Sequence, residues 1–318
     1  MRGKQVTVFG GSGFIGRHLV QRLARAGARV TVAVRDPEAA LFLKPMGDVG
    51  QIAPVYANVR KPKSVQKAVA GADAVVNLVG ILHEGGQSFA AVHGLGARNI
   101  AAAAAEAGVE RVVHMSAIGA ADSSPAVYST SKAAGEAAVR AAVPGAVILR
   151  PSVVFGPEDN FLNRFAAMVR LVPVLPLIGG GDQRFQPVFV GDVADAIMAG
   201  LTRDDALGKT FELGGPRVMT FREIMEIVLA STGRKALLLP LPFGVARMIG
   251  LVAQFLPSPP LTADHVRMMQ QGDNVVGNGA ASFADLGIAD LETIEVSAAG
   301  YLARFRKPGS DEVGDLPA

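Results

Sequence analysis

The chain has 318 residues, which is enough to bury a large core in one elaborated domain or in two closely joined ones. Half of the residues are hydrophobic, which excludes global disorder, and no run of about 18 uninterrupted apolar residues predicts a membrane span. The 31 basic and 28 acidic residues give a net charge of +3 without a long basic run, so nucleic acid is not an expected partner. Cysteine is absent, which excludes disulfides and thiol catalysis and fits a reducing, cytoplasmic compartment.

Residues 5–19, QVTVFGGSGFIGRHL, predict a buried strand, a glycine turn and an amphipathic helix. Only four residues precede the strand, so we expect no secretory or transit peptide. The turn satisfies two glycine spacings, Gly11-x-Gly13-x-x-Gly16 and Gly10-x-x-Gly13-x-x-Gly16. Glycines allow a tight turn and close approach of a pyrophosphate, which then faces the free N–H groups of the helix N-terminus. The alternative is an ordinary glycine turn, but the strand and helix around it favour dinucleotide binding.

Residues 29–34 predict a second strand, and Arg35 and Asp36 follow it. In a dinucleotide-binding fold the residue at this strand end faces the adenosine ribose; an acid there suits NAD, and an arginine can pair with the 2′-phosphate of NADP. Asp36 precedes Pro37 and is typical of a helix N-cap, which leaves Arg35 for the phosphate. NADP(H) is therefore the preferred cofactor and NAD(H) the alternative, unless Arg35 is an ordinary solvated charge.

The next elements are a strand at 51–56, a helix at 64–69, a strand at 74–79 and a long helix at 89–107. Asn58 follows the third strand and could bind the adenine or cap a turn. The fourth strand ends at Val79 and Gly80, where a glycine would allow close approach of the cofactor. His93, within the long helix, is interpreted as a packed core histidine rather than a catalytic one.

Ser116 ends the fifth predicted strand, 112–115, and Tyr128 and Lys132 open the helix that follows. The tyrosine and the lysine are four residues apart, so they share one helix face. Parallel strands place the serine at the carboxyl edge of the sheet, where ligands bind. A phenol has a pKa of about 10, and a neighbouring ammonium together with an oxidised nicotinamide is expected to lower it. The serine would hold a substrate carbonyl, and the lysine would also hold ribose hydroxyls.

Beyond the helix at 128–142 the alternation of strands and helices weakens. The remaining predicted elements are strands at 146–149, 186–190 and 211–213, helices at 161–171, 192–201 (capped by Asp192) and 220–231 (opened by a capping box at Thr220), and a loop at 173–181. We expect an α/β fold, a Rossmann-like doubly wound parallel sheet with a smaller, mostly helical C-terminal domain on the substrate side. Residues 1–152 form the first domain with returning segments at about 186–215; the second takes 153–185 and 216–303, and 304–318 form a flexible tail. No metal site is predicted.

The segment 236–257, ALLLPLPFGVARMIGLVAQFLP, contains only two polar side chains, those of Arg247 and Gln254. Its helical part is expected at 243–255, which is too short to span a bilayer. One interpretation is a helix of the substrate-side domain that covers the cofactor cleft. The other is an exposed apolar patch of Phe243, Met248, Ile249, Val252 and Phe255, which would mark a site for a protein partner or a membrane surface.

The motifs GGSGFIG, NLVG, YSTSK and RPSVVFGPED resemble extended and atypical members of the short-chain dehydrogenase/reductase superfamily, over essentially the whole chain. More narrowly, VGILHEGGQSF, RPSVVFGPEDNFLNRF, LPLIGGGDQRFQPVFVGDVADA and PLTADHVRMMQQGDNVV are similar to bacterial relatives of the NADPH-binding accessory subunit of respiratory complex I. In that family the fold holds a nicotinamide nucleotide, often without known turnover, and members are linked to quinone metabolism.

The resemblance implies roles for individual residues of this chain. The pyrophosphate is expected on Gly10, Ser12, Gly13, Phe14 and Ile15, the 2′-phosphate on Arg35, and the nicotinamide side on Gly80, Tyr128, Lys132 and Pro151. The interval from Ser116 to Tyr128 is short beside that of members that bind nucleotide-sugars, which argues against a sugar substrate. Three hypotheses follow: an NADP(H)-binding reductase of a small carbonyl or quinone-related ligand; a non-catalytic nucleotide-binding subunit of a respiratory or quinone-synthesising assembly, peripheral at the inner membrane face; and, last, a sugar epimerase or dehydratase.

Overall fold

The structure is a computed structural model that describes residues 1–256, 259 and 261–307. The chain forms two compact units. Unit 1 consists of Met1–Pro151, Gly191–Leu213 and Gly277–Ala289; unit 2 consists of Ser152–Val190, Gly214–Val276 and the chain from Asp290. Of the tail predicted at 304–318, residues 308–318 lie outside the described residues, as does Pro257 at the end of the apolar segment.

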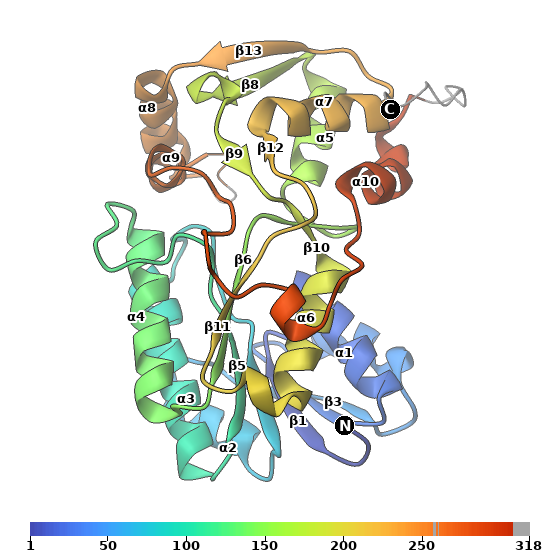
Figure 1. Ribbon diagram of the computed structural model, residues 1–318, viewed down its shortest axis with the longest axis vertical. Helices are drawn as coiled ribbons and strands as arrows, with labels where there is room; N and C mark the ends of the chain where they lie inside the picture. The colour runs from blue at the N-terminus through green and yellow to red at the C-terminus, as the bar shows by residue number, and fades with distance from the viewer. Residues whose placement is uncertain (257–258, 260, 308–318) are drawn as a thin grey trace. The chain divides into compact units, whose positions relative to one another are not determined.

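Unit 1 is built on a seven-stranded sheet in the order β11-β6-β5-β4-β1-β2-β3, with every neighbouring pair parallel (Figure 1). The strands are β1 (Gln5–Phe9), β2 (Arg29–Val34), β3 (Ile52–Tyr56), β4 (Ala74–Asn77), β5 (Arg111–Met115), β6 (Val147–Pro151) and β11 (Thr210–Leu213). The order runs outward from β1 through β2 to β3 and from β4 through β5 to β6, so the sheet is doubly wound and its switch point lies between β1 and β4. The predicted fold class is confirmed.

Helices cover both faces of this sheet. The helices α2 (Pro62–Val69), α3 (Gly96–Glu106) and α4 (Val127–Ala142) share a core with the side chains of Phe9, Val75 and Ile148 from the strands. On the other face, α6 (Val190–Thr202) brings Gly200 against Val113 and Val147, and an ion pair between Arg22 and Asp195 joins it to α1 (Phe14–Arg25). Strand residues alternate between these two cores because successive side chains point to opposite faces.

Unit 2 is smaller and holds most of the phenylalanines. Its helices α5 (Leu162–Leu171), α7 (Phe221–Thr232) and α10 (Ile294–Leu302) enclose a core in which the rings of Phe161, Phe165, Phe185 and Phe221 contact one another. The predicted capping box is confirmed, because the Thr220 hydroxyl accepts from the Glu223 N–H while the Glu223 carboxylate accepts from the Thr220 N–H. Two short strand pairs, β7 (Val154–Phe155) with β10 (Val188–Phe189) and β9 (Arg184–Phe185) with β12 (Met219–Thr220), complete this core.

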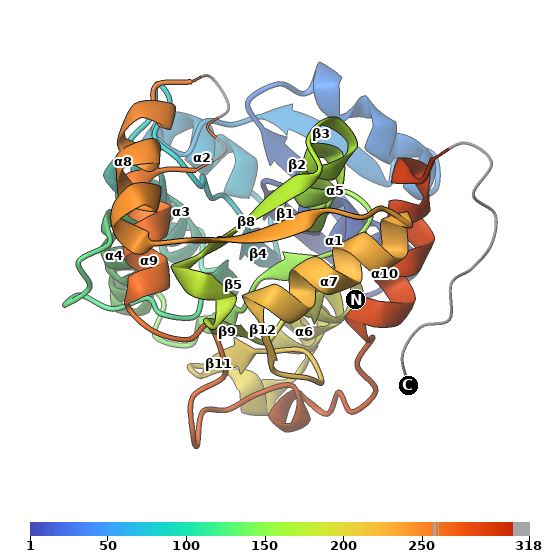
Figure 2. The same ribbon diagram turned by 90° about the horizontal axis from the view of Figure 1, so that it is seen from above.

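The prediction of a loop at 173–181 is wrong. Residues Val174–Ile178 form β8, which pairs in parallel with β13 (Leu237–Leu241), as Figure 2 shows. Both strands contain a proline, Pro176 and Pro240. A two-stranded sheet tolerates proline because each of its strands is an edge strand, whose outward N–H groups have no ladder partner to lose.

Smaller differences concern element ends. The long helix predicted at 89–107 begins as a π-helix, η2 (Ala90–Leu95), before α3. Asp192 lies within the first turn of α6 rather than before the helix, and α8 (Phe243–Ala253) ends two residues early. The other helical segments are α9 (Ala263–Gln270) and the 3₁₀ turns η1 (Glu38–Met46), η3 (Gly179–Gly181), η4 (Asp204–Ala206), η5 (Ala284–Leu286) and η6 (Ala303–Phe305). Within the described ranges, no helix is long and apolar enough to cross a membrane.

Candidate nucleotide-binding and active site

The glycine turn after β1 has a backbone that only glycines fit. Gly10 has a φ of +78°, in the left-handed region, and its carbonyl accepts from the Gly13 N–H at 3.0 Å. A Cβ atom on Gly16 would lie 2.4 Å from the Gly10 carbonyl oxygen, and one on Gly11 would lie 2.9 Å from a Val32 methyl group. The first glycine therefore allows the turn, and the other two let α1 pack against β1 and β2.

The N-terminus of α1 is suited to an anion. The helix begins at Phe14, its N-cap residue Gly13 supplies no side-chain hydrogen bond, and its first turn contains no acidic residue. Ser12, Phe14 and Ile15 are partly exposed beside it. The N–H groups of a first helical turn lack backbone partners within the helix and carry the positive end of the helix dipole. A pyrophosphate suits this helix N-terminus, because no side chain caps the helix and no acidic residue in its first turn would repel the anion.

Arg35 and Asp36 divide the roles at the end of β2. The Asp36 carboxylate accepts from the backbone N–H groups of Glu38 and Ala39 at 3.1 and 3.2 Å, so its predicted capping role is confirmed. Arg35 is exposed and forms no hydrogen bond or ion pair with any residue in the described part of the chain. Strand β2 lies next to β1, so the guanidinium belongs to the same sheet edge as the glycine turn.

Asn58, which follows β3, was predicted either to bind the adenine or to cap a turn, and the structure shows the turn. Its side-chain oxygen accepts from the Arg60 N–H at 3.1 Å, and its backbone N–H donates to the Ser64 hydroxyl at 3.0 Å. These bonds close the turn into α2. They leave the adenine role of Asn58 as a prediction.

The end of β4 lies beside the glycine turn across the switch point. The Val79 N–H donates to the side-chain oxygen of Asn77 at 3.1 Å, which fixes the chain as it leaves the strand. A Cβ atom on the exposed Gly80 would lie 3.4 Å from Nζ of Lys132. A glycine at this position thus leaves the surroundings of the lysine open to a ligand.

Lys132 and Ser116 meet at the carboxyl end of β5. The buried Lys132 ammonium donates to the Met115 carbonyl oxygen at 3.1 Å, one residue before Ser116. The ring centroid of Tyr128 lies 5.9 Å from Nζ of Lys132. Ser116 is itself buried, and its N–H donates to the Leu149 carbonyl of β6. The structure therefore brings all three predicted catalytic residues to one edge of unit 1.

Pro151 ends β6 at this same edge. Its carbonyl oxygen accepts from the Ile118 N–H at 3.0 Å, which holds the segment after Ser116 alongside the end of β6. The ring is buried. Pro151 is therefore placed with the other residues expected around the nicotinamide, although its contact with a cofactor stays a prediction.

Burial governs the protonation states of the tyrosine and the lysine. It raises the pKa of Tyr128 to about 12 and lowers the pKa of Lys132 to about 8, the latter partly opposed by the negative charge of Glu136. The expected lowering of the tyrosine pKa requires an oxidised nicotinamide as well as the ammonium and stays a prediction; in the protein by itself, desolvation of the phenolate dominates. A phenol that stays protonated at neutral pH is suited to donate a proton.

Sequence reasoning missed a buried carboxylate one turn beyond Lys132. Glu136 is 1% exposed and forms ion pairs with Arg150 at 2.8 Å and with Arg140 at 2.9 Å. Burial opposes its charge, but the hydrogen bonds from Arg150 and other favourable contacts outweigh burial and lower the pKa of Glu136. The spacing of Tyr128, Lys132, Glu136 and Arg140, four residues apart on one helix, could have indicated this line of charges.

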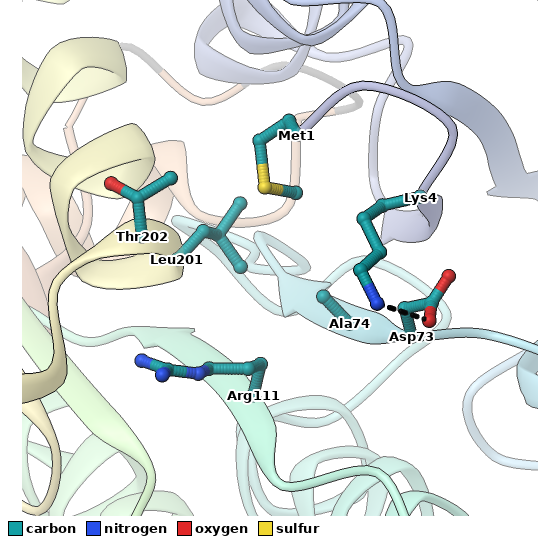
Figure 3. A pocket seen from close by; sticks show the side chains of 7 residues that line it. All are labelled: Met1, Lys4, Asp73, Ala74, Arg111, Leu201 and Thr202. Atoms are coloured by element: carbon teal, nitrogen blue, oxygen red, sulfur yellow. Dashed lines mark hydrogen bonds and ion pairs between the residues drawn. The ribbon is translucent and has the colours of Figure 1, made fainter.

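A cavity of about 480 Å³ lies at the opposite edge of the sheet (Figure 3). Most of its lining residues precede or begin strands, as Lys4 does for β1 and Arg111 for β5, and the others come from the end of α6. The ammonium of Lys4 pairs with Asp73 at 3.0 Å. The cavity is lined by Met1, Lys4, Asp73, Ala74, Arg111, Leu201 and Thr202. Because the glycine turn and Ser116 lie at the carboxyl ends of the strands, this cavity is separate from the candidate site. No group of metal-ligating side chains occurs within residues 1–256, 259 and 261–307.

The doubly wound sheet and its glycine turn define a dinucleotide-binding α/β protein. The chain belongs to the NAD dependent epimerase/dehydratase family, whose model matches residues 6–214. The match covers unit 1 from β1 to the end of β11, which includes every residue of the candidate site.

Relatives of two kinds are 33–38% identical to this chain. The mitochondrial NADH dehydrogenase (ubiquinone) 1 alpha subcomplex subunit 9 of Arabidopsis thaliana is 38% identical over 317 residues, which cover 95% of this chain and 78% of that protein. The mitochondrial NADH-ubiquinone oxidoreductase 40 kDa subunit of Neurospora crassa is 33% identical over 319 residues, which cover 99% of this chain and 82% of that protein. A ceramide reductase of Caulobacter vibrioides is 33% identical over 240 residues, 74% of this chain and 73% of the reductase.

Solved structures agree in fold at low identity. The Citrobacter triphenylmethane reductase complexed with NADP(H) superposes with a TM-score of 0.72 at 20% identity, covering 93% of this chain and 99% of that one. MoeE5 in complex with UDP-glucose and NAD superposes with a TM-score of 0.67 at 20% identity, covering 94% and 97%. One of these structures thus holds NADP(H) and the other holds NAD. The resemblance stated from the motifs is confirmed at the level of the family.

Proposed function

We propose that this chain is an NADP(H)-dependent reductase of a small carbonyl or quinone-related ligand. The observation that carries the proposal is the placement of Lys132, which lies between the exposed Gly80 at the end of β4 and the Met115 carbonyl at the end of β5, with the Tyr128 ring beside it. A cation, a phenol and a serine at the carboxyl edge next to the switch point form a set suited to carbonyl reduction.

Each residue has a task in this account. Gly10, Ser12, Gly13, Phe14 and Ile15 hold the pyrophosphate, Asn58 borders the adenine, and Val79, Gly80 and Pro151 border the nicotinamide. When bound, reduced nicotinamide supplies a hydride to the carbonyl carbon. Ser116 holds the carbonyl oxygen by a hydrogen bond, and the Tyr128 hydroxyl gives that oxygen its proton, so that a ketone becomes an alcohol. Lys132 holds the ribose and, as a cation, stabilises the tyrosinate that remains.

The preference for NADP(H) rests on Arg35. Its exposed guanidinium stands at the end of β2 without a partner among the described residues, while Asp36, the acid that could serve NAD, is engaged as a helix cap. A planar guanidinium suits a phosphate group.

The substrate class is supported by the reductases among the relatives. Ceramide reductase is 33% identical, and a ketoreductase of a farnesylated quinoline oxide from Stigmatella aurantiaca is 26% identical over 262 residues. Both names describe reductions of apolar molecules. A sugar nucleotide is less favoured because the loop from Ser116 to Tyr128 is short.

Label transfer tests this proposal. NADPH deuterated at C4 of the nicotinamide is incubated with the full chain and methyl octyl ketone or a decyl-benzoquinone. We expect deuterium in the alcohol formed from the ketone, and oxidation of NADPH that depends on the quinone. Tight NADPH binding without turnover of either probe would contradict the reductase and favour the second candidate.

The second candidate is a nucleotide-binding subunit of a respiratory or quinone-synthesising assembly, peripheral at the inner face of the cytoplasmic membrane. Subunits of complex I are among the relatives of 31–38% identity. The apolar face of α8 is a second observation in its favour: Met248, Val252 and Phe255 are 71%, 76% and 84% exposed. No acidic residue occurs between Glu226 and Asp264, whereas Arg247 lies within α8. An exposed apolar face on a segment that carries an arginine and no carboxylate suits an anionic lipid surface. In this account unit 2 is the partner domain.

A further inference from the structure

His93 lies in the π-helical segment η2, at the point where the backbone departs from regular α-helix. Such π-turns are rare and occur frequently at functional sites. Helix α4 approaches this segment closely, since a Cβ atom on Gly135 would lie 2.5 Å from the His93 carbonyl oxygen. The imidazole is 2% exposed, so its hydrogen bonds are made inside unit 1.

Both ring nitrogens of His93 have partners. The Ile81 N–H donates to Nε2 at 3.0 Å, and Nδ1 lies 2.9 Å from the Ser131 hydroxyl. Burial lowers the pKa of His93 to about 3, with the nearby positive charge of Lys132 as the next cause, so the ring is neutral at pH 7. A neutral imidazole carries one N–H, and Nε2 acts as an acceptor. The proton is therefore on Nδ1, which donates to Ser131.

The hydrogen bonds continue in the same direction. The Ser131 hydroxyl, having accepted from His93, donates to the backbone carbonyl of Tyr128 at 2.7 Å. A directed chain thus runs from the Ile81 N–H through the imidazole and the serine to the first turn of α4. Its beginning adjoins Gly80, and its end is the residue that carries the proposed proton donor.

The rings around His93 constrain the same tyrosine. The imidazole stacks on Phe89 with centroids 5.5 Å apart, and the Tyr128 ring meets both edge-on, at 5.4 Å from His93 and 5.8 Å from Phe89. A partly buried ring held edge-on by two others has little freedom to tilt.

We propose that His93 is a positioning residue that fixes the strand-end loop at Gly80 and Ile81 to the helical turn of Tyr128, and thereby sets the separation between the nicotinamide site and the proton donor. The inference rests on the proposed reductase function. The histidine takes no part in proton transfer, because neither ring nitrogen is available to a substrate. Reactions that depend on a near-attack geometry are sensitive to displacements of about 1 Å, which cost on the order of a hundredfold in rate.

The test compares His93→Phe, which keeps the stacked ring but removes both hydrogen bonds of the imidazole, with Ser131→Ala, which keeps the bond from Ile81 to His93 but removes the hydroxyl that joins His93 to the Tyr128 carbonyl. Thr130→Ala, one residue before Ser131, is the matched control, because the Thr130 hydroxyl donates to the Val127 carbonyl at 3.1 Å and takes no part in the chain from His93. With NADPH and methyl octyl ketone we expect kcat to fall by roughly ten- to a hundredfold in His93→Phe and less in Ser131→Ala, with KM and the NADPH dissociation constant within about threefold. The pH profile should keep its shape, and Thr130→Ala should resemble the wild type.

A second readout does not depend on turnover. Hydrogen exchange of the Ile81 amide should accelerate by about tenfold or more in His93→Phe and stay unchanged in Thr130→Ala, since loss of the acceptor frees this N–H. Unchanged kcat in a folded His93→Phe would overturn the proposal, as would loss of a limb of the pH profile, which would make His93 an acid or base. If the wild type never reduces a carbonyl, the reductase proposal fails, while Ile81 exchange still decides whether His93 fixes this loop.

Discussion

The ammonium of Lys132 donates to the carbonyl oxygen of Met115 across 3.1 Å, joining the second turn of α4 to the end of β5. This bond places a buried cation one residue from Ser116. Burial lowers the pKa of Lys132 to about 8, so at neutral pH the lysine is still mostly protonated but close to titration. Lys132→Ala should therefore weaken NADPH binding and turnover together, because one group holds the ribose and stabilises the tyrosinate. Calorimetry and steady-state kinetics separate the two losses; loss of turnover alone would contradict the ribose contact.

Arg35→Ala should weaken NADPH binding by about ten- to a hundredfold, since a charge-assisted contact to phosphate contributes about 1.5–3 kcal/mol. NADH affinity should barely change, because that nucleotide lacks the 2′-phosphate. Isothermal calorimetry with both nucleotides measures the difference. The exposed Arg25, at the far end of α1, supplies the matched control Arg25→Ala. Wild-type protein that binds NADH as tightly as NADPH would refute the assignment of Arg35.

Stability should decrease as pH falls below about 6.5, because two buried histidines resist protonation. Burial, followed by the charge of Lys132, lowers the pKa of both His93 and His114 to about 3. Between the unfolded and folded pKa values the unfolded chain binds more protons than the folded one. Each histidine therefore lowers the free energy of unfolding by roughly 2 kcal/mol when the pH falls from 7 to 5. Urea unfolding at these two values measures it. His114→Gln should remove about half of the decrease, and equal stability at both values in the wild type would be inconsistent with neutral burial.

Met248→Glu/Ile249→Glu should abolish co-sedimentation with anionic liposomes and leave the melting temperature unchanged. Both side chains are exposed on α8, so the carboxylates cost little in the folded protein but oppose insertion into an anionic surface. Val49→Glu is the control, since Val49 is fully exposed and belongs to unit 1, whereas α8 belongs to unit 2. If the double variant does not fold and the wild type does not bind lipid, the membrane-surface interpretation is wrong and this segment is part of the core.

The fold of unit 1 could be predicted because its signals are local. Apolar strands, the glycine turn at Gly10 and the four-residue spacing of Tyr128 and Lys132 each act within a few residues. Pairing between distant segments was harder: β8 and β13 are joined across more than fifty residues of sequence, and their prolines concealed them. In the patch predicted on 236–257, Phe243 is partly buried against Gly179, whereas the other four members are exposed.

Charge networks were also hidden from the sequence. The burial of Glu136 and the pKa of Tyr128 depend on what packs against α4, which no spacing along the helix reveals. His93 was correctly interpreted as a packed histidine. Its link to Ser131 required the position of η2, because the π-turn rotates the side chains that follow it relative to a regular helix.

The central claim, reduction with Tyr128 as the proton donor, is tested most directly by one comparison. Deuterium transfer from C4-labelled NADPH to methyl octyl ketone is measured for the wild type and Tyr128→Phe, with NADPH affinity measured on the same samples. We predict labelled alcohol from the wild type, a loss of at least about a hundredfold in Tyr128→Phe, and NADPH affinity within a few-fold, because the ring remains and only its proton is removed. Full label transfer by Tyr128→Phe would contradict the claim and place the proton donor elsewhere.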